Sequence, residues 1–211
     1  MISTMLNNDA DYFLELQTQT GWGRTLYSFA TWCAPNEDWR VLDVGCGPGL
    51  LPAIFTQFGC RAVGIDLDIG MFHPSALHPE IAVANVYDLP FTTHTFDLIT
   101  ASNLIFLLSE PSGALVGMKL FLKPGGRVAM LNPSEVLTKK AASDFANEKG
   151  LEGVARNTLL NWARRASDHH QYNEAETNTL YREAGMKCMA SILKVGPGFG
   201  RFSWGVVESY D

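Results

Sequence analysis

The segment VLDVGCGPGL, at residues 41–50, constrains the fold of this chain more than any other stretch. Residues 40–44 suit a buried strand, and glycine then occupies three of the next five positions, Gly45, Gly47 and Gly49. Glycine tolerates positive φ angles and lets a ligand approach the backbone closely. A helix beginning near Gly49 would aim its free N–H groups at the same place, which favours an anionic group. The segment therefore predicts a strand, a binding loop and a helix, in that order.

Strand-like and helix-like segments alternate through the first two thirds of the chain. Strands are expected at 40–44, 60–65, 81–84, 96–101 and 127–131, with helices at 24–33, 50–58 and 110–122. Such alternation favours a parallel, doubly wound sheet with helices on both faces. The predicted class is therefore α/β.

The rest of the chain departs from this alternation. Two successive helices are expected at 134–147 and 153–167, followed by a helix at 173–184 that opens with a capping box of Asn173 and Glu176. Strands at 187–194 and 203–210 would form an antiparallel hairpin at the edge of a mostly parallel, seven-stranded sheet. We expect one domain over residues 1–211: a helical cap (1–39), a core (40–131), a helical lid (132–172) and a C-terminal helix with the hairpin (173–211).

Composition limits the classes of partner. Hydrophobic residues make up 46% of the 211 residues and the net charge is −6, which weighs against nucleic acid or an anionic membrane as a partner. The pair Arg164-Arg165 is interpreted as a solvated helix face. No signal peptide or membrane span is expected, so we predict a cytoplasmic protein. The four cysteines fit no zinc pattern, and no metal site is predicted.

The spacing of the glycines restricts the ligand. A dinucleotide site favours G-x-G-x-x-G, but Leu50 occupies the place of the third glycine, and no Gly-Lys-Ser/Thr follows as in a phosphate-binding loop. Asp66 follows Gly45 by 21 residues, at the end of the second expected strand. A carboxylate there accepts hydrogen bonds from ribose hydroxyls. The residues thus predict a ligand that contains a ribose but no pyrophosphate.

Several segments together resemble one known family. VLDVGCGPGLL followed by GIDLD, ANVYDLPF (84–91), FDLITASNLIFLL (96–108) and LKPGGRVAML (122–131) occur in the order found in class I S-adenosylmethionine-dependent methyltransferases. The nearest subgroup is the small-molecule type, similar to ubiquinone and menaquinone biosynthesis methyltransferases. The resemblance implies a Rossmann-like fold, S-adenosyl-L-methionine as cofactor with S-adenosyl-L-homocysteine as product, and methyl transfer to a small-molecule acceptor.

The resemblance also assigns roles around the glycine loop. Gly45, Cys46 and Gly47 would line the methionine end of the cofactor through backbone atoms. Asp43 would hold either the loop amides or the cofactor's amino group. Asp66 would bind the ribose.

A second group of roles follows from the later motifs. Leu67 would pack on the adenine, and Val86 would offer it a backbone N–H. Asn85 stands where the family usually has Asp; its oxygen would accept from the adenine amino group without charge assistance. The Ser102 backbone would face the methionine amino group, and Asn103 would face the acceptor.

Four further residues are candidates on weaker grounds. Arg24 would neutralise the cofactor carboxylate, and Tyr12 and Trp22 would form an aromatic wall near the sulfonium, since rings attract cations. His169 is the best candidate for an acceptor-side base, but no residue is assigned as catalytic.

Two other functions remain open from the sequence. Asn85 is compatible with a cofactor-binding regulatory protein of weak or lost activity. A nicotinamide-dependent oxidoreductase is disfavoured by the glycine spacing and by the absence of a Tyr-x-x-x-Lys pair.

Overall fold

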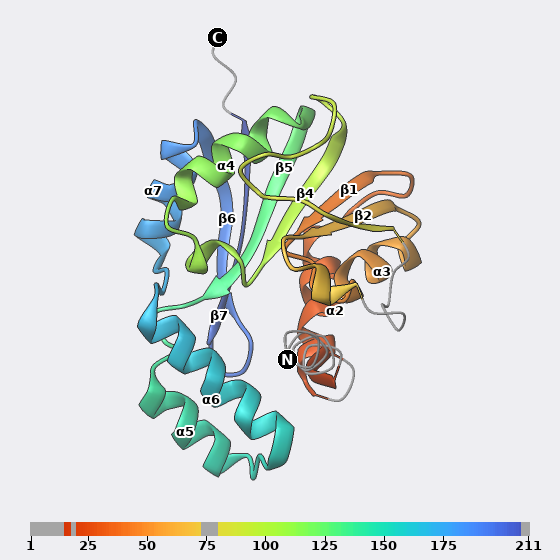
Figure 1. Ribbon diagram of the computed structural model, residues 1–211. Helices are drawn as coiled ribbons and strands as arrows, with labels where there is room; N and C mark the ends of the chain where they lie inside the picture. Colours follow the sequence, from red (N-terminus) through yellow and green to blue (C-terminus); the bar gives the residue numbers. More distant parts are fainter. Residues whose placement is uncertain (1–14, 18–19, 73–79, 208–211) are drawn as a thin grey trace.

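The computed structural model of the chain describes residues 15–17, 20–72 and 80–207. Its centre is a seven-stranded sheet with the order β3-β2-β1-β4-β5-β7-β6 (Figure 1). The strands are β1 (Arg40–Val44), β2 (Arg61–Asp66), β3 (Ile81–Val83), β4 (Phe96–Ser102), β5 (Leu122–Pro133), β6 (Met186–Lys194) and β7 (Gly200–Val207). Strands β1 to β5 pair in parallel, and β7 is antiparallel to both of its neighbours. The predicted α/β class is confirmed.

Helices cover both faces of this sheet. Helices α2 and α3 lie on one face, and α4 and α7 lie on the other (Figure 1). The helices are α2 (Trp22–Cys33), α3 (Leu50–Gln57), α4 (Pro111–Leu120), α5 (Lys139–Glu148), α6 (Gly153–Asp168) and α7 (Glu174–Glu183), with short 3₁₀ turns η1 (Ile69–Met71) and η2 (Ile105–Leu107). The predicted capping box at the start of α7 is present.

The central strands are buried on both faces. Val41 and Leu98 pack into the core beneath α2 and α3. Their sequence neighbours Leu42 and Ile99 pack into the core beneath α4 and α7. All four are fully buried. Since successive side chains of a strand point to opposite faces, these continuous apolar runs are what a strand between two helical layers requires.

The strand order reverses between β1 and β4. From β1 the chain passes outward to β2 and β3, whereas β4 and β5 follow on the opposite side. Open α/β sheets bind ligands in the crevice at the carboxyl ends of their strands at such a reversal. Helices α5 and α6 lie at this end of the sheet (Figure 1).

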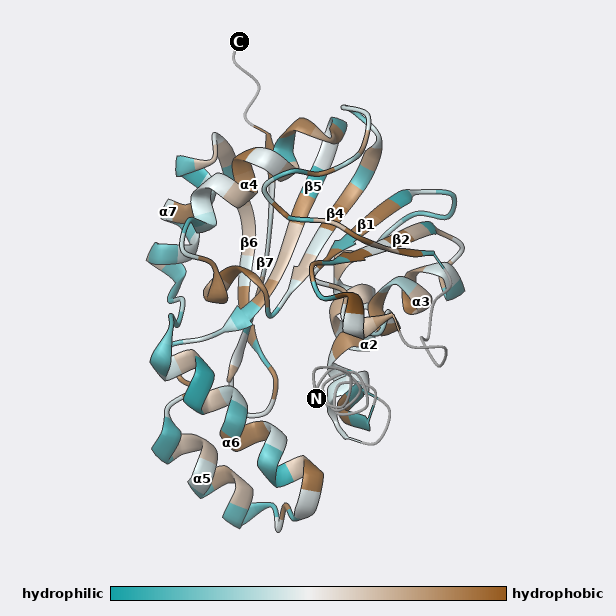
Figure 2. Cartoon of the chain, in the orientation of Figure 1, coloured by the Kyte–Doolittle hydropathy of each residue, from teal (hydrophilic) through white to brown (hydrophobic). Residues whose placement is uncertain are grey.

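The two lid helices, α5 and α6, pack on each other and on the loop before β7. Their shared core consists of Leu137, Ala142, Ala163, Ala166 and Phe199, and their outer surfaces are largely hydrophilic (Figure 2). The first lid helix begins at Lys139, five residues later than predicted. Residues 134–138 instead form a turn that ends at Thr138, whose hydroxyl caps α5 by accepting from the Ala141 N–H at 3.0 Å.

The C-terminal hairpin enters the sheet in an order that the sequence did not indicate. Its second strand, β7, pairs with β5, so β6 forms the edge. Arg201 of β7 is 4% exposed. Its guanidinium donates to both Glu135 carboxylate oxygens, at 2.9 and 3.0 Å, and to the Tyr172 carbonyl at 3.1 Å. This buried contact ties the hairpin to the two ends of the lid segment.

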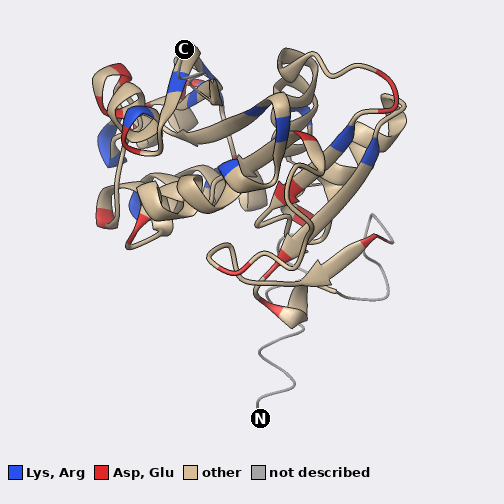
Figure 3. Cartoon of the chain, turned by 90° about the horizontal axis from the view of Figure 1, so that it is seen from above, with Lys and Arg blue, Asp and Glu red and all other residues tan. Residues whose placement is uncertain are grey.

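Charged residues of both signs are spread along the chain. Viewed from above, the positions of Lys and Arg lie among those of Asp, Glu and uncharged residues (Figure 3). Within the part of the chain that the structure describes, no helix is both long and apolar enough to cross a membrane.

Gly64 of β2 provides a test of how closely the sheet and the glycine loop are packed. An added Cβ would lie 2.7 Å from Cys46 Sγ and 3.0 Å from Pro52 Cγ, both held in the core. We expect Gly64→Ala to lower the free energy of unfolding in urea by about 1–3 kcal/mol through overpacking. Gly113→Ala, on an exposed face of α4 with nothing closer than 3.7 Å, is the control. It should be neutral or stabilise by about 0.5–1 kcal/mol, and equal effects of the two would contradict the argument.

Candidate active site

The loop between β1 and α3 is bound to the end of β2 by its backbone. The N–H groups of Gly45 and Cys46 both donate to the Ile65 carbonyl, at 2.8 and 2.9 Å. Gly47 and Gly49 follow with φ angles of +54° and +91°, which residues with a Cβ rarely adopt. Gly49 also directly precedes α3, so the free N–H groups of that helix face the loop. The predicted order of strand, loop and helix is confirmed.

The Asp66 carboxylate, at the last residue of β2, braces the same loop from a second side. Its Oδ2 accepts from the Gly47 N–H at 2.9 Å, and its Oδ1 accepts from the Asp68 N–H at 3.0 Å. An ionised carboxylate offers about four acceptor positions. Each oxygen can therefore accept one more donor, and Asp66 lines the cleft described below.

Asp43 lies beneath the loop and is 2% exposed. Its Oδ1 accepts from the Thr100 hydroxyl at 2.7 Å. Burial raises the pKa of Asp43 to about 7, because the ionised form loses its water; the Thr100 hydrogen bond opposes this shift and the charge of Asp66 adds to it. The loop amides that were one predicted partner of Asp43 donate to Ile65 instead. The second Asp43 oxygen has no partner among the described residues, which leaves it for a cationic group.

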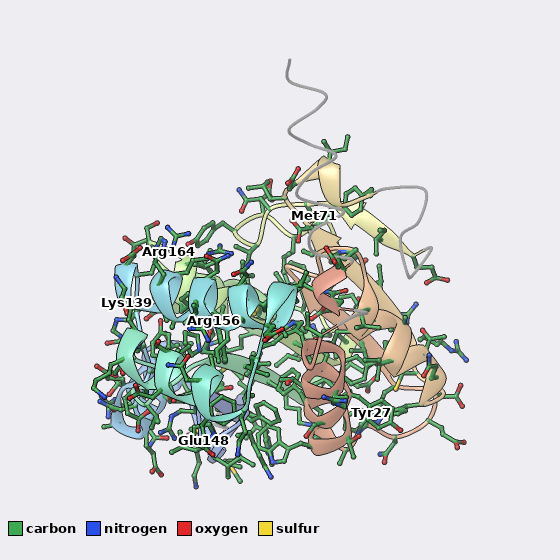
Figure 4. All side chains as sticks on the ribbon, turned by 90° about the horizontal axis from the view of Figure 1, so that it is seen from below. Tyr27, Met71, Lys139, Glu148, Arg156 and Arg164 are labelled. Carbon is green, nitrogen blue, oxygen red and sulfur yellow. The ribbon has the colours of Figure 1, made fainter. Side chains whose placement is uncertain are left out.

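These groups form the floor of a cleft of about 760 Å³. One wall comes from the segments that follow β2 and β3, and the other comes from α2 and the lid helix α6. Figure 4 views the cleft end of the molecule from below, with Met71 of the first wall and Arg164 of α6 labelled on either side. The volume lies within the range of small-molecule sites.

Two tryptophans close the cleft between α2 and the lid. The rings of Trp22 and Trp162 meet edge to face, with centroids 5.3 Å apart. The Trp162 indole N–H donates to Asn103 Oδ1 at 2.9 Å. Trp22 and Asn103 therefore both line the cleft, as predicted from sequence, but the Asn103 oxygen is already bound to the lid.

The opposite end of the cleft is formed by residues predicted to contact a base. Leu67, Asn85 and Val86 line it, and Leu67 is 68% exposed, so its apolar surface is open to a ligand. The Asn85 side-chain oxygen accepts from the Tyr87 N–H at 3.0 Å. That oxygen can accept only one further donor. Ser102, at the end of β4, also lines the cleft.

Three predicted site residues do not line this cleft. Arg24 lines a second cavity and not this cleft, whereas Trp22 lines both. His169 is exposed at the end of α6 and does not line the cleft. Its ring contacts that of Phe106, with the two ring centroids 6.4 Å apart. Gly49 shapes the start of α3 without lining the cleft. Tyr12 lies outside the described residues.

Other residues of the cleft were missed. Gln17 and Thr158 come from the N-terminal segment and α6, and no sequence pattern marks them, since only the tertiary fold brings them together. Arg164 and Arg165 line the cleft as well. Their interpretation as a solvated face was incomplete, because the exposed side of α6 turns toward the mouth of the cleft.

Comparison with known proteins agrees with this geometry. A family profile described as a methyltransferase domain matches residues 42–130. The ubiquinone biosynthesis O-methyltransferase of Nitrobacter winogradskyi is 31% identical over 145 residues, which cover 65% of this chain and 51% of that protein. The chain spans about half the length of the curated relatives that it matches first.

Solved structures show the same fold at low sequence identity. A TehB-like S-adenosylmethionine-dependent methyltransferase from Corynebacterium glutamicum superposes with a TM-score of 0.65 and 15% identity, covering 98% of this chain and 100% of that one. The magnesium protoporphyrin IX methyltransferase of Synechocystis PCC 6803, solved with bound S-adenosylhomocysteine, gives 0.63 and 16%, covering 93% and 88%. At these identities the likeness is one of fold.

The buried carboxylate predicts a pH-dependent stability. Because burial raises the folded-state pKa of Asp43 from 3.8 to about 7, its ionisation opposes folding, and its contribution to the free energy of unfolding falls as the pH rises from about 4 to 7. Asp43→Asn keeps the shape without the charge. We expect the variant to be more stable than the wild type by about 1–2 kcal/mol at pH 8, with a smaller difference at pH 5. Urea unfolding at both values measures this, with Asp88→Asn in an exposed turn as the control.

If Asp43→Asn instead lowered the free energy of unfolding by the same amount at pH 8 and at pH 5, the charge of Asp43 would not be the cause of the pH dependence.

Proposed function

We propose that the chain is a class I S-adenosylmethionine-dependent methyltransferase and that it transfers a methyl group from S-adenosylmethionine to a small organic acceptor. One observation carries the proposal: the glycine loop and the carboxylates of Asp43 and Asp66 meet on the floor of a single cleft. A loop without side chains allows close approach, and two acids with free acceptor positions suit a ligand that carries a cation and a ribose.

The residues of the floor fit this cofactor part by part. Asp43, whose second oxygen has no described partner, would hold the ammonium group. Asp66 would accept from the ribose hydroxyls beside its two backbone donors. Leu67 and Val86 would pack against the adenine, and Asn85 would use its remaining acceptor position for the adenine amino group.

The chain's own part in the reaction is to orient and to exclude water. When bound, S-adenosylmethionine supplies a methyl group on a positively charged sulfur that is already activated for displacement. Trp22 and Trp162 would present aromatic surface near that charge, which stabilises a cation. The hydrogen bond from Trp162 to Asn103 would hold the lid helix α6 in a fixed position against the end of β4. His169 lies outside the cleft, so the proposal assigns no general base.

A small acceptor is favoured by the shape of the site. The cleft lies beneath α6 and is bounded on several sides by side chains, which suits a compact molecule more than a duplex or a protein surface. One of the matching curated relatives is named for ubiquinone biosynthesis, and the net charge of −6 disfavours a polyanionic partner.

One observation favours a second candidate, a cofactor-binding protein with weak or no turnover. Asn85 replaces the usual acidic residue, and its oxygen is shared with the Tyr87 N–H. Both features weaken the hydrogen bond that the adenine amino group would receive.

Ligand binding tests the cofactor assignment. We expect S-adenosylhomocysteine to raise the melting temperature, whereas NAD should leave it unchanged. In calorimetry, Asp66→Ala should weaken S-adenosylhomocysteine binding at least tenfold, because it removes hydrogen bonds to a charged acceptor that contribute about 1.5–3 kcal/mol. Gly47→Val should block binding, since its side chain would enter the cleft.

Asp88→Ala is the matched control, because Asp88 is an exposed carboxylate near Asn85 that does not line the cleft. It should bind S-adenosylhomocysteine as the wild type does. A thermal response to NAD alone, or an unchanged affinity in both Asp66→Ala and Gly47→Val, would overturn the proposed function.

A further inference from the structure

A second cavity of about 910 Å³ adjoins the cleft. It lies between α2, the lid helices and the loop that joins β6 to β7. Four residues line both spaces: Gln17, Trp22, Thr158 and Trp162. The edge-to-face tryptophans therefore form part of a boundary that a long ligand would cross on its way to the cofactor site.

Two polar atoms at this boundary have no hydrogen-bond partner among the described residues. Gln17 is 8% exposed, and its Oε1 is buried without a hydrogen bond. The hydroxyl of Thr158 is likewise buried and unpaired among the described residues. Buried polar groups are nearly always paired in folded proteins, so an unpaired acceptor and hydroxyl beside two cavities point to a ligand with a hydrogen-bond donor.

The backbone places Gln17 close to the glycine loop. A Cβ added to Gly47 would lie 3.8 Å from Gln17 Nε2, so the Gln17 amide lies next to the part of the loop assigned to the methionine end. A Cβ added to Gly23 would lie 2.4 Å from the Gln17 carbonyl oxygen, so only glycine allows the start of α2 to approach this closely. The amide is therefore held between the loop and the second cavity.

The charged residues described at the second cavity are both basic. Arg24 and Lys194 are the only charged side chains among the described residues that line it. Neither makes an ion pair within the described ranges, although the chain as a whole has 22 acidic and 16 basic residues. Two such cations, in a lining whose described residues include no acid, favour an anionic group.

The rest of the lining is largely apolar. Phe145 and Phe199 meet edge to face at 5.4 Å, and Leu159 and Phe202 complete this surface. A ligand that suits the whole cavity has an apolar body, an anionic end near Arg24 and Lys194, and a donor near Gln17.

We propose that the second cavity binds the methyl acceptor, and that the acceptor is an apolar organic acid with a hydroxyl or amino group at the end opposite its anionic group. The inference rests on the proposed function. Gln17 would accept the acceptor's O–H or N–H and so orient a lone pair toward the methyl carbon. The acceptor's oxygen or nitrogen gains the methyl group and releases its proton to water, while the sulfur keeps the electron pair of the broken bond and becomes neutral.

Three matched probes test the chemistry in the full chain saturated with S-adenosylhomocysteine. 4-Hydroxycinnamate has the donor and the carboxylate, cinnamate lacks the hydroxyl, and methyl 4-hydroxycinnamate lacks the charge. Calorimetry should show the hydroxy acid binding roughly tenfold tighter than either analogue. No binding of any probe at millimolar concentration, or equal binding of acid and ester, would overturn the proposal.

Two double variants locate the charge. Arg24→Gln with Lys194→Gln should bind acid and ester equally. Arg164→Gln with Arg165→Gln, which changes cations of the first cleft, should keep the preference for the acid. The reverse result would place the anionic group in the first cleft and overturn the assignment of the second cavity.

Gln17→Leu tests the donor. The variant should lose the preference for 4-hydroxycinnamate over cinnamate while its melting temperature is unchanged or higher, because an unpaired polar group is removed. A lower melting temperature with the preference intact would mean that Gln17 only supports the fold.

The response to S-adenosylhomocysteine separates this inference from the proposed function. If S-adenosylhomocysteine stabilises the protein but no probe binds, the acceptor class is wrong and the cofactor site stands. If S-adenosylhomocysteine has no effect, the proposed function itself fails.

Discussion

The hydrogen bonds between the glycine loop and the end of β2 are the contacts on which the rest of the site depends. The Ile65 carbonyl accepts from two loop amides, and the next residue, Asp66, accepts from a third. Residues about twenty positions apart in sequence are thereby fixed at one edge of the sheet. The loop is held in one conformation because its amides are hydrogen-bonded within the protein. A ligand can still reach its backbone because Gly47 carries no side chain.

Charge is arranged unevenly around this loop. Asp43 and Asp66 lie on the floor, and the pKa of Asp43 is raised to about 7 because burial removes its water. The cations Arg164 and Arg165 line the same cleft from the lid helix α6, and Arg24 and Lys194 line the second cavity. A buried acid whose one partner among the described residues is Thr100 costs folding free energy, and a cationic ligand group would recover part of that cost on binding. A ligand with a cationic group would therefore stabilise this site, as expected when function sets the residue type.

Local sequence patterns were sufficient to predict the central strands and helices, but not the order of the strands at the edge of the sheet. Residues 40–131 alternate between buried strands and helices, so periodicity and the glycine loop placed β1, α3 and Asp66 correctly. The sequence could not show that β7 would insert beside β5, since strand order depends on pairing between distant segments. Gln17 and Thr158 were missed for a related reason: their meeting at the boundary of two cavities is purely tertiary. Arg24 was predicted to neutralise the cofactor carboxylate, but in the structure it lines the second cavity and not the cleft.

A crystal structure of the protein with S-adenosylhomocysteine tests the central claim most directly. We expect the ligand in the cleft, with its ribose hydroxyls within hydrogen-bond distance of Asp66, its ammonium group beside Asp43 and its adenine against Leu67 and Val86. A ligand bound elsewhere, or a cleft filled by the protein's own side chains while the ligand is excluded, would contradict it.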